Sequence, residues 1–157
     1  MATVIDAKWV YAWKTDEHGW VVKIVARGFK QREGIDFREA FTPTVSSSCV
    51  RFLNTIACQC HSDSCHFDAD QAFVESDLEE DVFLRLPEGC GDLSGKIVRL
   101  NKSLYGSKQA SRMWHAHLIT GLKSLGFERC KADVCVFRLI EDDFFAVGRK
   151  ERCYSFL

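Results

Sequence analysis

The residues best suited to chemistry begin with Asp68, which ends a short apolar segment and is followed five residues later by the aromatic Phe73. Carboxylate oxygens are the ligands that Mg²⁺ prefers, and paired Mg²⁺ ions stabilise the attacking and leaving oxygens of a phosphoryl displacement. An aromatic ring at this spacing suits the sugar of a bound nucleotide. The two residues therefore predict a nucleotide site, which would need a second acidic pair to hold two metal ions.

A second segment, residues 102–112, is dense in groups that contact phosphates and nucleotides. It contains the cations Lys102, Lys108 and Arg112, and the pair Tyr105 and Gly106 lies between them. Lysine and arginine bind phosphate oxygens, and glycine allows close approach of the backbone to a ligand. A solvated helix face explains the three cations equally well, so both interpretations stay open.

The composition limits the classes of function that the chain can have. It has 157 residues, of which 46% are hydrophobic and 27% charged, as is typical of a soluble globular protein. The net charge of −1 excludes a global basic field, so any binding to nucleic acid must be local. The apolar runs are shorter than a membrane span, and the N-terminus lacks the layout of a signal peptide. We expect an intracellular protein, in the cytoplasm or nucleus, that is not secreted and does not enter membranes.

Eight cysteines raise the questions of disulfides and metal binding. A disulfide framework is disfavoured because secretion signals are missing and a chain of this length can form its own core. The crowding of Cys58, Cys60 and Cys65 with two histidines suggests a zinc-dependent interaction module. The usual Cys-x2-Cys spacing is missing, however, and no second ligand pair follows. We favour buried thiols along a helix.

Hydrophobic periodicity predicts the elements that position these residues. Two segments rich in Trp, Val and Tyr, residues 8–14 and 20–27, predict a hairpin. A helix is predicted to begin near Ser46, and the clearest helix covers residues 107–125. Short strands are predicted at 66–69, 82–86, 96–100, 134–139 and 144–147. The pattern indicates an α+β fold in which helices pack on a mainly antiparallel sheet.

Four stretches taken together resemble a known family: residues 25–31, 33–37, 72–80 and 102–106. From about residue 8 to residue 147, the chain resembles the reverse transcriptase domain in the Pol polyprotein of copia-type long-terminal-repeat retrotransposons. The resemblance implies a fingers–palm architecture and DNA synthesis on RNA and DNA templates. It also implies Mg²⁺ as cofactor, and dNTP and an RNA/DNA template-primer as partners.

The resemblance implies a role for each candidate residue. Asp68 corresponds to the first metal-binding aspartate, and Phe73 to the ring that lies beneath the deoxyribose and excludes a 2′-hydroxyl. Arg27 corresponds to a basic residue of the fingers, where a planar guanidinium suits the triphosphate. Tyr105 and Gly106 correspond to the loop under the nucleotide and template. For each residue a structural role stays open as the alternative: a capping aspartate, a core ring or a solvated charge.

The chain departs from the family pattern near its C-terminal end. The family continues into an aromatic-Val-Asp-Asp hairpin that completes the metal site, whereas residues 148–157 match neither the family nor, by their pattern, a strand. Asp142 and Asp143 are candidates for the missing pair, but Glu141 precedes them, and we favour an exposed turn. We therefore expect a fingers-like portion at 1–45, a partial palm at 46–147 and a non-family tail at 148–157.

A truncated palm has consequences for activity and assembly. A single carboxylate cannot fix two Mg²⁺ ions, so we expect a polymerase fragment that is inactive on its own. The missing strands would leave a sheet edge open, which a partner could cover. An alternative is a nucleic-acid-binding module without catalysis, which would use the three cations of residues 102–112.

Overall fold

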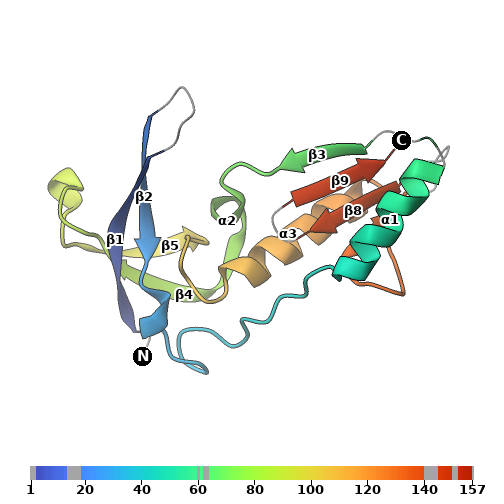
Figure 1. The fold of residues 1–157 in the computed structure, drawn as a ribbon. Helices are drawn as coiled ribbons and strands as arrows, with labels where there is room; N and C mark the ends of the chain where they lie inside the picture. The colour runs from blue at the N-terminus through green and yellow to red at the C-terminus, as the bar shows by residue number, and fades with distance from the viewer. Residues whose placement is uncertain are drawn as a thin grey trace. The chain divides into compact units, whose positions relative to one another are not determined.

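The computed structural model describes residues 3–13, 19–59, 61, 64–139, 145–149 and 152–156. The chain divides into two compact units. Unit 1 consists of Met1–Phe41 and Phe73–Met113, and unit 2 of Thr42–Ala72 and Trp114–Leu157. Figure 1 shows the order of the helices and strands along the chain.

Unit 1 is built on a four-stranded sheet with the order β2-β1-β4-β5. Its strands are β1 (Val4–Trp13), β2 (Trp20–Ala26), β4 (Asp77–Arg85) and β5 (Ile97–Lys102). The antiparallel pairing of β1 with β2 confirms the predicted hairpin, and β4 pairs with β5 in the same manner. β1 and β4 are parallel, so the sheet is mixed.

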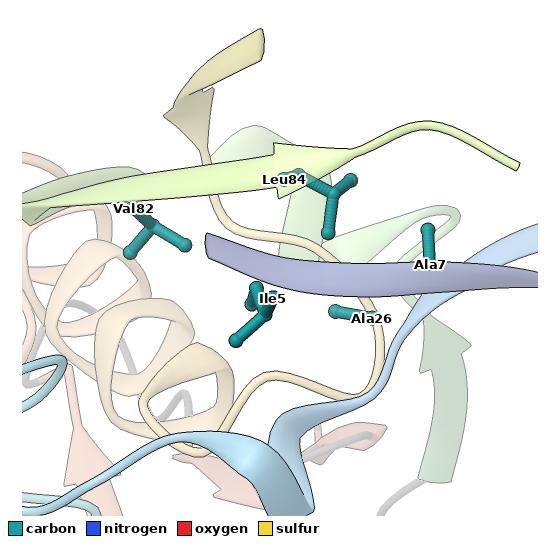
Figure 2. Packing of buried hydrophobic residues seen from close by; sticks show 5 residues of the cluster. All are labelled: Ile5, Ala7, Ala26, Val82 and Leu84. Atoms are coloured by element: carbon teal, nitrogen blue, oxygen red, sulfur yellow. The ribbon is translucent and has the colours of Figure 1, made fainter. Parts of the chain in front are cut away.

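The core of unit 1 lies on one face of this sheet. Figure 2 shows its buried cluster, which consists of Ile5, Ala7, Ala26, Val82 and Leu84. Pairs of these residues two positions apart come from β1 and from β4, because alternate side chains of a strand share a face. Ile5 and Leu84 are each 1% exposed and are direct partners across the parallel pair. Burial of an aliphatic side chain of this size contributes about 1.5–3 kcal/mol.

Short helical elements connect the strands. They are the 3-10 helices η1 (Gly28–Lys30) and η2 (Gly91–Leu93) and the single helical turn α2 (Ala72–Glu75). The longer α3 (Ala110–Ser124) begins in unit 1 and ends in unit 2. It confirms the helix predicted for residues 107–125, and its Met113 and Trp114 are buried.

Unit 2 contains a five-stranded antiparallel sheet with the order β3-β9-β8-β7-β6. Its strands are β3 (Ser64–Asp68), β6 (Glu128–Arg129), β7 (Val136–Arg138), β8 (Phe145–Arg149) and β9 (Arg152–Phe156). The helix α1 (Ser47–Gln59) buries Leu53 and Ala57 against Val136. The helix begins near Ser46 as predicted, and Ser46 caps it, because its Oγ accepts a hydrogen bond from the N–H of Cys49 at 3.1 Å.

The C-terminal segment corrects one prediction. The expectation that residues 148–157 match no strand was wrong, because β9 pairs with both β8 and β3. Two aromatic residues, Tyr154 and Phe156, alternate with small residues here, and such alternation suits a pleated strand. β9 thus covers one side of β3, while β3 and β6 form the two edges of the described sheet.

Candidate nucleotide site

The turn at Tyr105 and Gly106 lies against the end of β2. The carbonyl oxygen of Tyr105 accepts a hydrogen bond from the N–H of Ala26 at 2.8 Å. Gly106 has a φ of +87°, and a Cβ atom there would lie 2.3 Å from the carbonyl oxygen of Ala26. Gly28 faces the same turn, since its Cβ would lie 2.0 Å from the carbonyl oxygen of Gly106. Glycine is needed at both positions because two stretches of backbone are in contact.

Two side chains meet the ring of Tyr105. The centroids of Phe73 and Tyr105 are 4.9 Å apart with an interplanar angle of 66°, which is the edge-to-face arrangement that aromatic pairs prefer. The Nζ of Lys23 lies 4.9 Å from the centroid of the Tyr105 ring, within range of a cation–π interaction. The structure therefore brings together Phe73, Tyr105 and Gly106, three of the predicted nucleotide contacts.

Arg27 lies beside this group because it follows β2 directly. Its N–H donates a hydrogen bond to the carbonyl of Asp6 at 2.9 Å, and its side chain is exposed. Its two neighbours in sequence, Ala26 and Gly28, are the residues that contact the 105–106 turn. All four residues predicted to contact the nucleotide thus belong to unit 1 and lie around one turn.

Sequence reasoning missed Lys23 as a member of this group. In β2 it is exposed and pairs in register with Val10 of β1, so the strand pattern marks it as an ordinary surface charge. Its position over the Tyr105 ring depends on a turn about eighty residues further along the chain. A local pattern carries no signal for such a contact.

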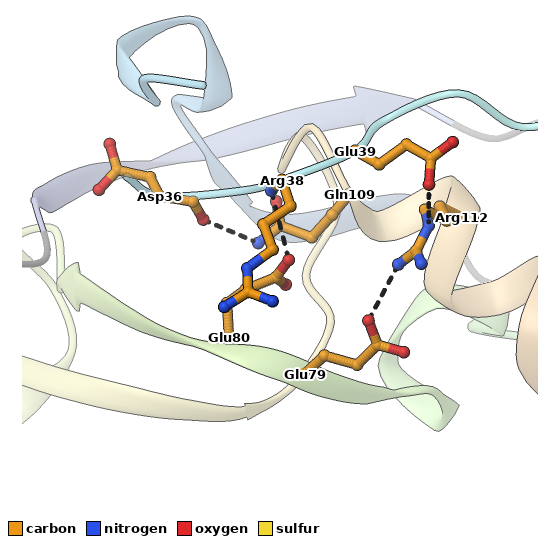
Figure 3. A network of polar contacts seen from close by, with 7 residues as sticks. All are labelled: Asp36, Arg38, Glu39, Glu79, Glu80, Gln109 and Arg112. Carbon is orange, nitrogen blue, oxygen red and sulfur yellow. Dashed lines mark hydrogen bonds and ion pairs between the residues drawn. The ribbon is translucent and has the colours of Figure 1, made fainter. Parts of the chain in front are cut away.

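Two of the three cations predicted to bind nucleic acid have acidic partners within unit 1. The Nζ of Lys102 lies 2.7 Å from Oδ1 of Asp77. Figure 3 shows Arg112 between Glu79 and Glu39, at 3.0 Å and 3.3 Å. The hydrogen bond to Glu79 raises the pKa of the Arg112 guanidinium. A phosphate would have to compete with these carboxylates.

Lys108, the third cation, is exposed, and its backbone is held by a buried polar network. The N–H of Lys108 donates to Oε1 of Gln31 at 2.8 Å, and Nε2 of Gln31 donates to Oε1 of Gln109 at 2.9 Å. Figure 3 also shows Nε2 of Gln109 directed at the carbonyl of Asp36, 3.5 Å away. Gln31 and Gln109 are 7% and 0% exposed, and sequence reasoning had not singled out either residue.

Asp36, whose carbonyl is the partner of Gln109, also uses its carboxylate in hydrogen bonds. It accepts hydrogen bonds from the N–H groups of Thr3 and Arg32, each at 2.8 Å. Burial raises the pKa of this carboxyl, but the hydrogen bonds from Arg32 and Thr3 outweigh burial and hold the pKa below its ordinary value. Asp36 is therefore ionised at neutral pH although it is only 4% exposed.

We expect Asp36→Asn to lower the free energy of unfolding at pH 7 by about 1–3 kcal/mol, because the amide nitrogen that replaces one carboxylate oxygen cannot accept the hydrogen bond made there. The contribution of the carboxylate is complete above its ordinary pKa of 3.8 and is lost as the pH falls through the lower pKa of the folded state. Urea unfolding of both proteins at pH 7 and pH 3 measures the difference. A difference that stays constant with pH would contradict this account.

A polar cavity of about 370 Å³ lies next to these groups in unit 1. Its lining includes Glu79, Glu80 and Asp81 of β4, together with Arg38 and the apolar Ile35. In Figure 3, Glu80 accepts the N–H of Arg38, at 3.4 Å. Three carboxylates repel a triphosphate, so this cavity is not suited to a nucleotide.

Asp68, the predicted metal ligand, is the last residue of β3 in unit 2. Its partner in the antiparallel register is Arg152 of β9, which is in turn paired with Arg149 of β8. Among the residues that the structure describes, no three His, Cys, Asp or Glu residues gather in a way that could hold a metal ion. Asp142 and Asp143 lie outside the described residues. Paired Mg²⁺ ions need several carboxylate oxygens, and the described part of the chain contains no such group.

The cysteine predictions have a divided outcome. Cys58 is exposed, so the interpretation of a buried thiol was wrong for this residue. Cys49, also on α1, is half-buried in unit 2, where burial, and next the neighbouring Asp133, raise the pKa of its thiol. Cys60 and the side chain of Cys65 lie outside the described part, so zinc binding by this group stays a prediction.

Comparison with known proteins defines the class. Residues 2–144 match the family described as "Reverse transcriptase (RNA-dependent DNA polymerase)", and the chain belongs to this family. The sequence-based resemblance is thereby confirmed. No solved structure matches the chain significantly. In the described residues, no helix has both the length and the apolar character that crossing a membrane requires.

Individual relatives are retrotransposon polyproteins. The chain is 35% identical over 149 residues to the Retrovirus-related Pol polyprotein from transposon TNT 1-94 of Nicotiana tabacum, covering 89% of the chain and 11% of that protein. It is 30% identical over 143 residues to the one from transposon RE1 of Arabidopsis thaliana, covering 87% and 10%. The Transposon Ty1-DR5 Gag-Pol polyprotein of Saccharomyces cerevisiae matches over 72 residues at 35% identity, covering 45% and 4%. The chain thus spans about a tenth of the length of the first two.

Proposed function

We propose that this chain is the part of an RNA-directed DNA polymerase that contacts the incoming dNTP and the template-primer. In this proposal residues 1–45 form a fingers-like portion and residues 46–147 a partial palm. The observation that carries the proposal is the gathering of Arg27, Phe73, Tyr105 and Gly106 around one turn of unit 1. The family resemblance assigns these four residues to one site, and their contacts in unit 1 support that assignment.

Each residue of the group has a physical role in this proposal. The exposed guanidinium of Arg27 offers a planar fork of donors to the triphosphate. Phe73 is held edge-on against Tyr105, which fixes the plane of the ring that the deoxyribose would meet. The turn at Gly106 is immobilised by its contacts with Ala26 and Gly28, so the site loses little entropy when a nucleotide binds.

We also propose that this chain does not polymerise DNA by itself. Two-metal phosphoryl transfer needs several carboxylates around both ions. In the strand register the partner of Asp68 is Arg152, not a further acidic residue, and Arg152 is paired with Arg149. Residues 145–157 contain a single acidic residue, Glu151. In this proposal Asp68 is a lone metal ligand, and Asp142 and Asp143, which lie outside the described residues, are not its partners.

Binding and catalysis can be tested separately with the 157-residue chain. We expect dTTP to bind the chain on poly(rA)/oligo(dT), and Arg27→Ala to weaken this binding on the order of tenfold, the loss expected of a charge-assisted contact. Arg51→Ala is the matched control, because Arg51 is an exposed arginine on α1 in unit 2. Equilibrium dialysis with labelled dTTP measures both affinities.

In primer extension on the same template with Mg²⁺, we expect no product above background. Template-dependent products that disappear in Asp68→Asn would show that the chain is an active polymerase. Absence of dTTP binding, or equal affinities for Arg27→Ala and Arg51→Ala, would contradict the assignment of the nucleotide site.

A further inference from the structure

Two buried glutamines link the segments that carry the candidate nucleotide contacts. The side chain of Gln31 uses both ends of its amide within the protein: Nε2 donates to Oε1 of Gln109, and Oε1 accepts the N–H of Lys108. Gln31 and Gln109 are 78 residues apart in sequence and almost wholly inaccessible to solvent. A buried polar pair with its hydrogen bonds made fixes one arrangement, because breaking it would leave polar groups unsatisfied.

This pair belongs to a larger junction, which we call the clasp and define as residues 26–31 and 105–109. At one end of the clasp the N–H of Ala26 donates to the carbonyl of Tyr105. In the middle the backbones of Gly28 and Gly106 are in contact. At the other end Gln31 binds residues 108 and 109. Each side of the clasp is therefore attached to the other at three points along its length.

The clasp sets the position of Arg27 relative to Tyr105. Arg27 is on the first segment, between its first and second attachments, and Tyr105 begins the second segment. A nucleotide that binds a cation through its phosphates and lies over a turn needs both groups at a set separation. Without the hydrogen bonds of Gln31, the two segments of the clasp would be joined only by the Ala26–Tyr105 hydrogen bond and the Gly28–Gly106 contact.

We propose that Gln31 is a positioning residue for nucleotide binding, acting through Arg27 and without touching the nucleotide. The inference rests on the proposed function, since it concerns the same site. Gln31 is 7% exposed and its amide is occupied on both sides, so it offers no group to a ligand. If Gln31 acts through Arg27, its effect on affinity depends on the presence of the Arg27 guanidinium. A purely structural residue would show no such dependence.

A double-mutant cycle measures this dependence. The variants are Gln31→Met, which keeps the length of the side chain and removes both hydrogen bonds, Arg27→Ala, and the two combined. The matched control is Gln59→Met, because Gln59 is an exposed glutamine at the end of α1. The readout is dTTP affinity of the full chain on poly(rA)/oligo(dT), measured by equilibrium dialysis.

We expect Gln31→Met and Arg27→Ala each to weaken dTTP binding on the order of tenfold, within the usual range of coupling between sites. The combined variant should bind about as weakly as Arg27→Ala alone, because the two residues act through one contact. Gln59→Met should bind as the wild type does. Losses that multiply in the combined variant, or wild-type affinity in Gln31→Met, would overturn the proposal.

Failure of the proposed function gives a different result, because the wild-type chain would then not bind dTTP and the inference would fall with it. If circular dichroism shows that Gln31→Met is unfolded, Gln31→Glu replaces it in the cycle. That variant keeps the acceptor for the N–H of Lys108 and loses the donor to Gln109. We expect it to weaken binding in the presence of Arg27 and not in its absence, and wild-type affinity would again overturn the proposal.

Discussion

We expect Leu84→Ala to lower the free energy of unfolding by about 2–5 kcal/mol, the range found for large-to-small changes in protein cores. Leu84 is 1% exposed and belongs to the buried cluster of unit 1. It is the register partner of Ile5 across the parallel β1–β4 pair, so the cavity would open beside a rigid sheet that cannot collapse into it. Urea unfolding followed by circular dichroism measures the loss.

The control for this substitution is Leu93→Ala. Leu93 lies in η2 of the same unit and is 51% exposed, so the same atoms are removed from a partly hydrated site. We expect its effect to stay within about 0.5 kcal/mol, as for most surface substitutions. Equal losses for the two variants would show that the cluster around Ile5 is not the core of unit 1.

Local patterns predicted the elements of the fold better than their pairing. The β1–β2 hairpin and the helices α1 and α3 follow from apolar periodicity and from a capping serine, which act within a few residues. The parallel pairing of β1 with β4 joins segments about eighty residues apart, and the sequence of neither strand indicates which strand it pairs with. The predicted mainly antiparallel pairing holds for most strand pairs, whereas the parallel β1–β4 pair, which makes the sheet of unit 1 mixed, was not predicted.

The C-terminal strand shows a limit of family resemblance. Residues 152–156 departed from the family pattern, and this departure obscured an alternation of aromatic and small residues that suits a strand. β9 forms because it has partners on both sides, β8 and β3. Tertiary pairing of this kind overrides a weak local signal.

The individual residues of the candidate site were predicted from the sequence, but the contacts between its segments were not. Resemblance selected Arg27, Phe73, Tyr105 and Gly106 separately, whereas the structure adds Lys23 over the ring and the glutamine pair behind the turn. A buried glutamine cannot be recognised from sequence, because glutamine is usually exposed and is predicted to be so unless its hydrogen-bond partner is known. The partners lie on the far segment of the clasp, so a single-segment pattern cannot identify them.

The sequence also does not reveal the ion-pair partners of the cations that were predicted to bind phosphate. Lys102 and Arg112 were considered for phosphate binding because both are long, basic and close to the Tyr105 turn. The structure gives each of them carboxylate partners on other elements of unit 1. Exposed ion pairs are weak, so these contacts would reduce phosphate affinity rather than abolish it.

We expect Gly106→Ala to be among the most damaging single substitutions in unit 1, with a loss of about 3 kcal/mol or more from overpacking and backbone strain together. Its φ of +87° is unfavourable for alanine, and the added Cβ would lie 2.3 Å from the carbonyl oxygen of Ala26. A backbone oxygen cannot rotate away as a flexible side chain can, so the turn would have to separate from β2. Thermal and urea unfolding measure the effect.

Gly95→Ala separates the two causes of this loss. Gly95 has a φ of +73° in the same unit, and nothing lies within 4 Å of the position of its Cβ. This control therefore carries the backbone strain alone, about 1–2 kcal/mol, without the steric overlap. An equal loss in both variants would mean that contact with Ala26 is unimportant. A larger loss at Gly106, accompanied by weaker dTTP binding in the protein that stays folded, would show that the turn must lie against β2 for the site to form.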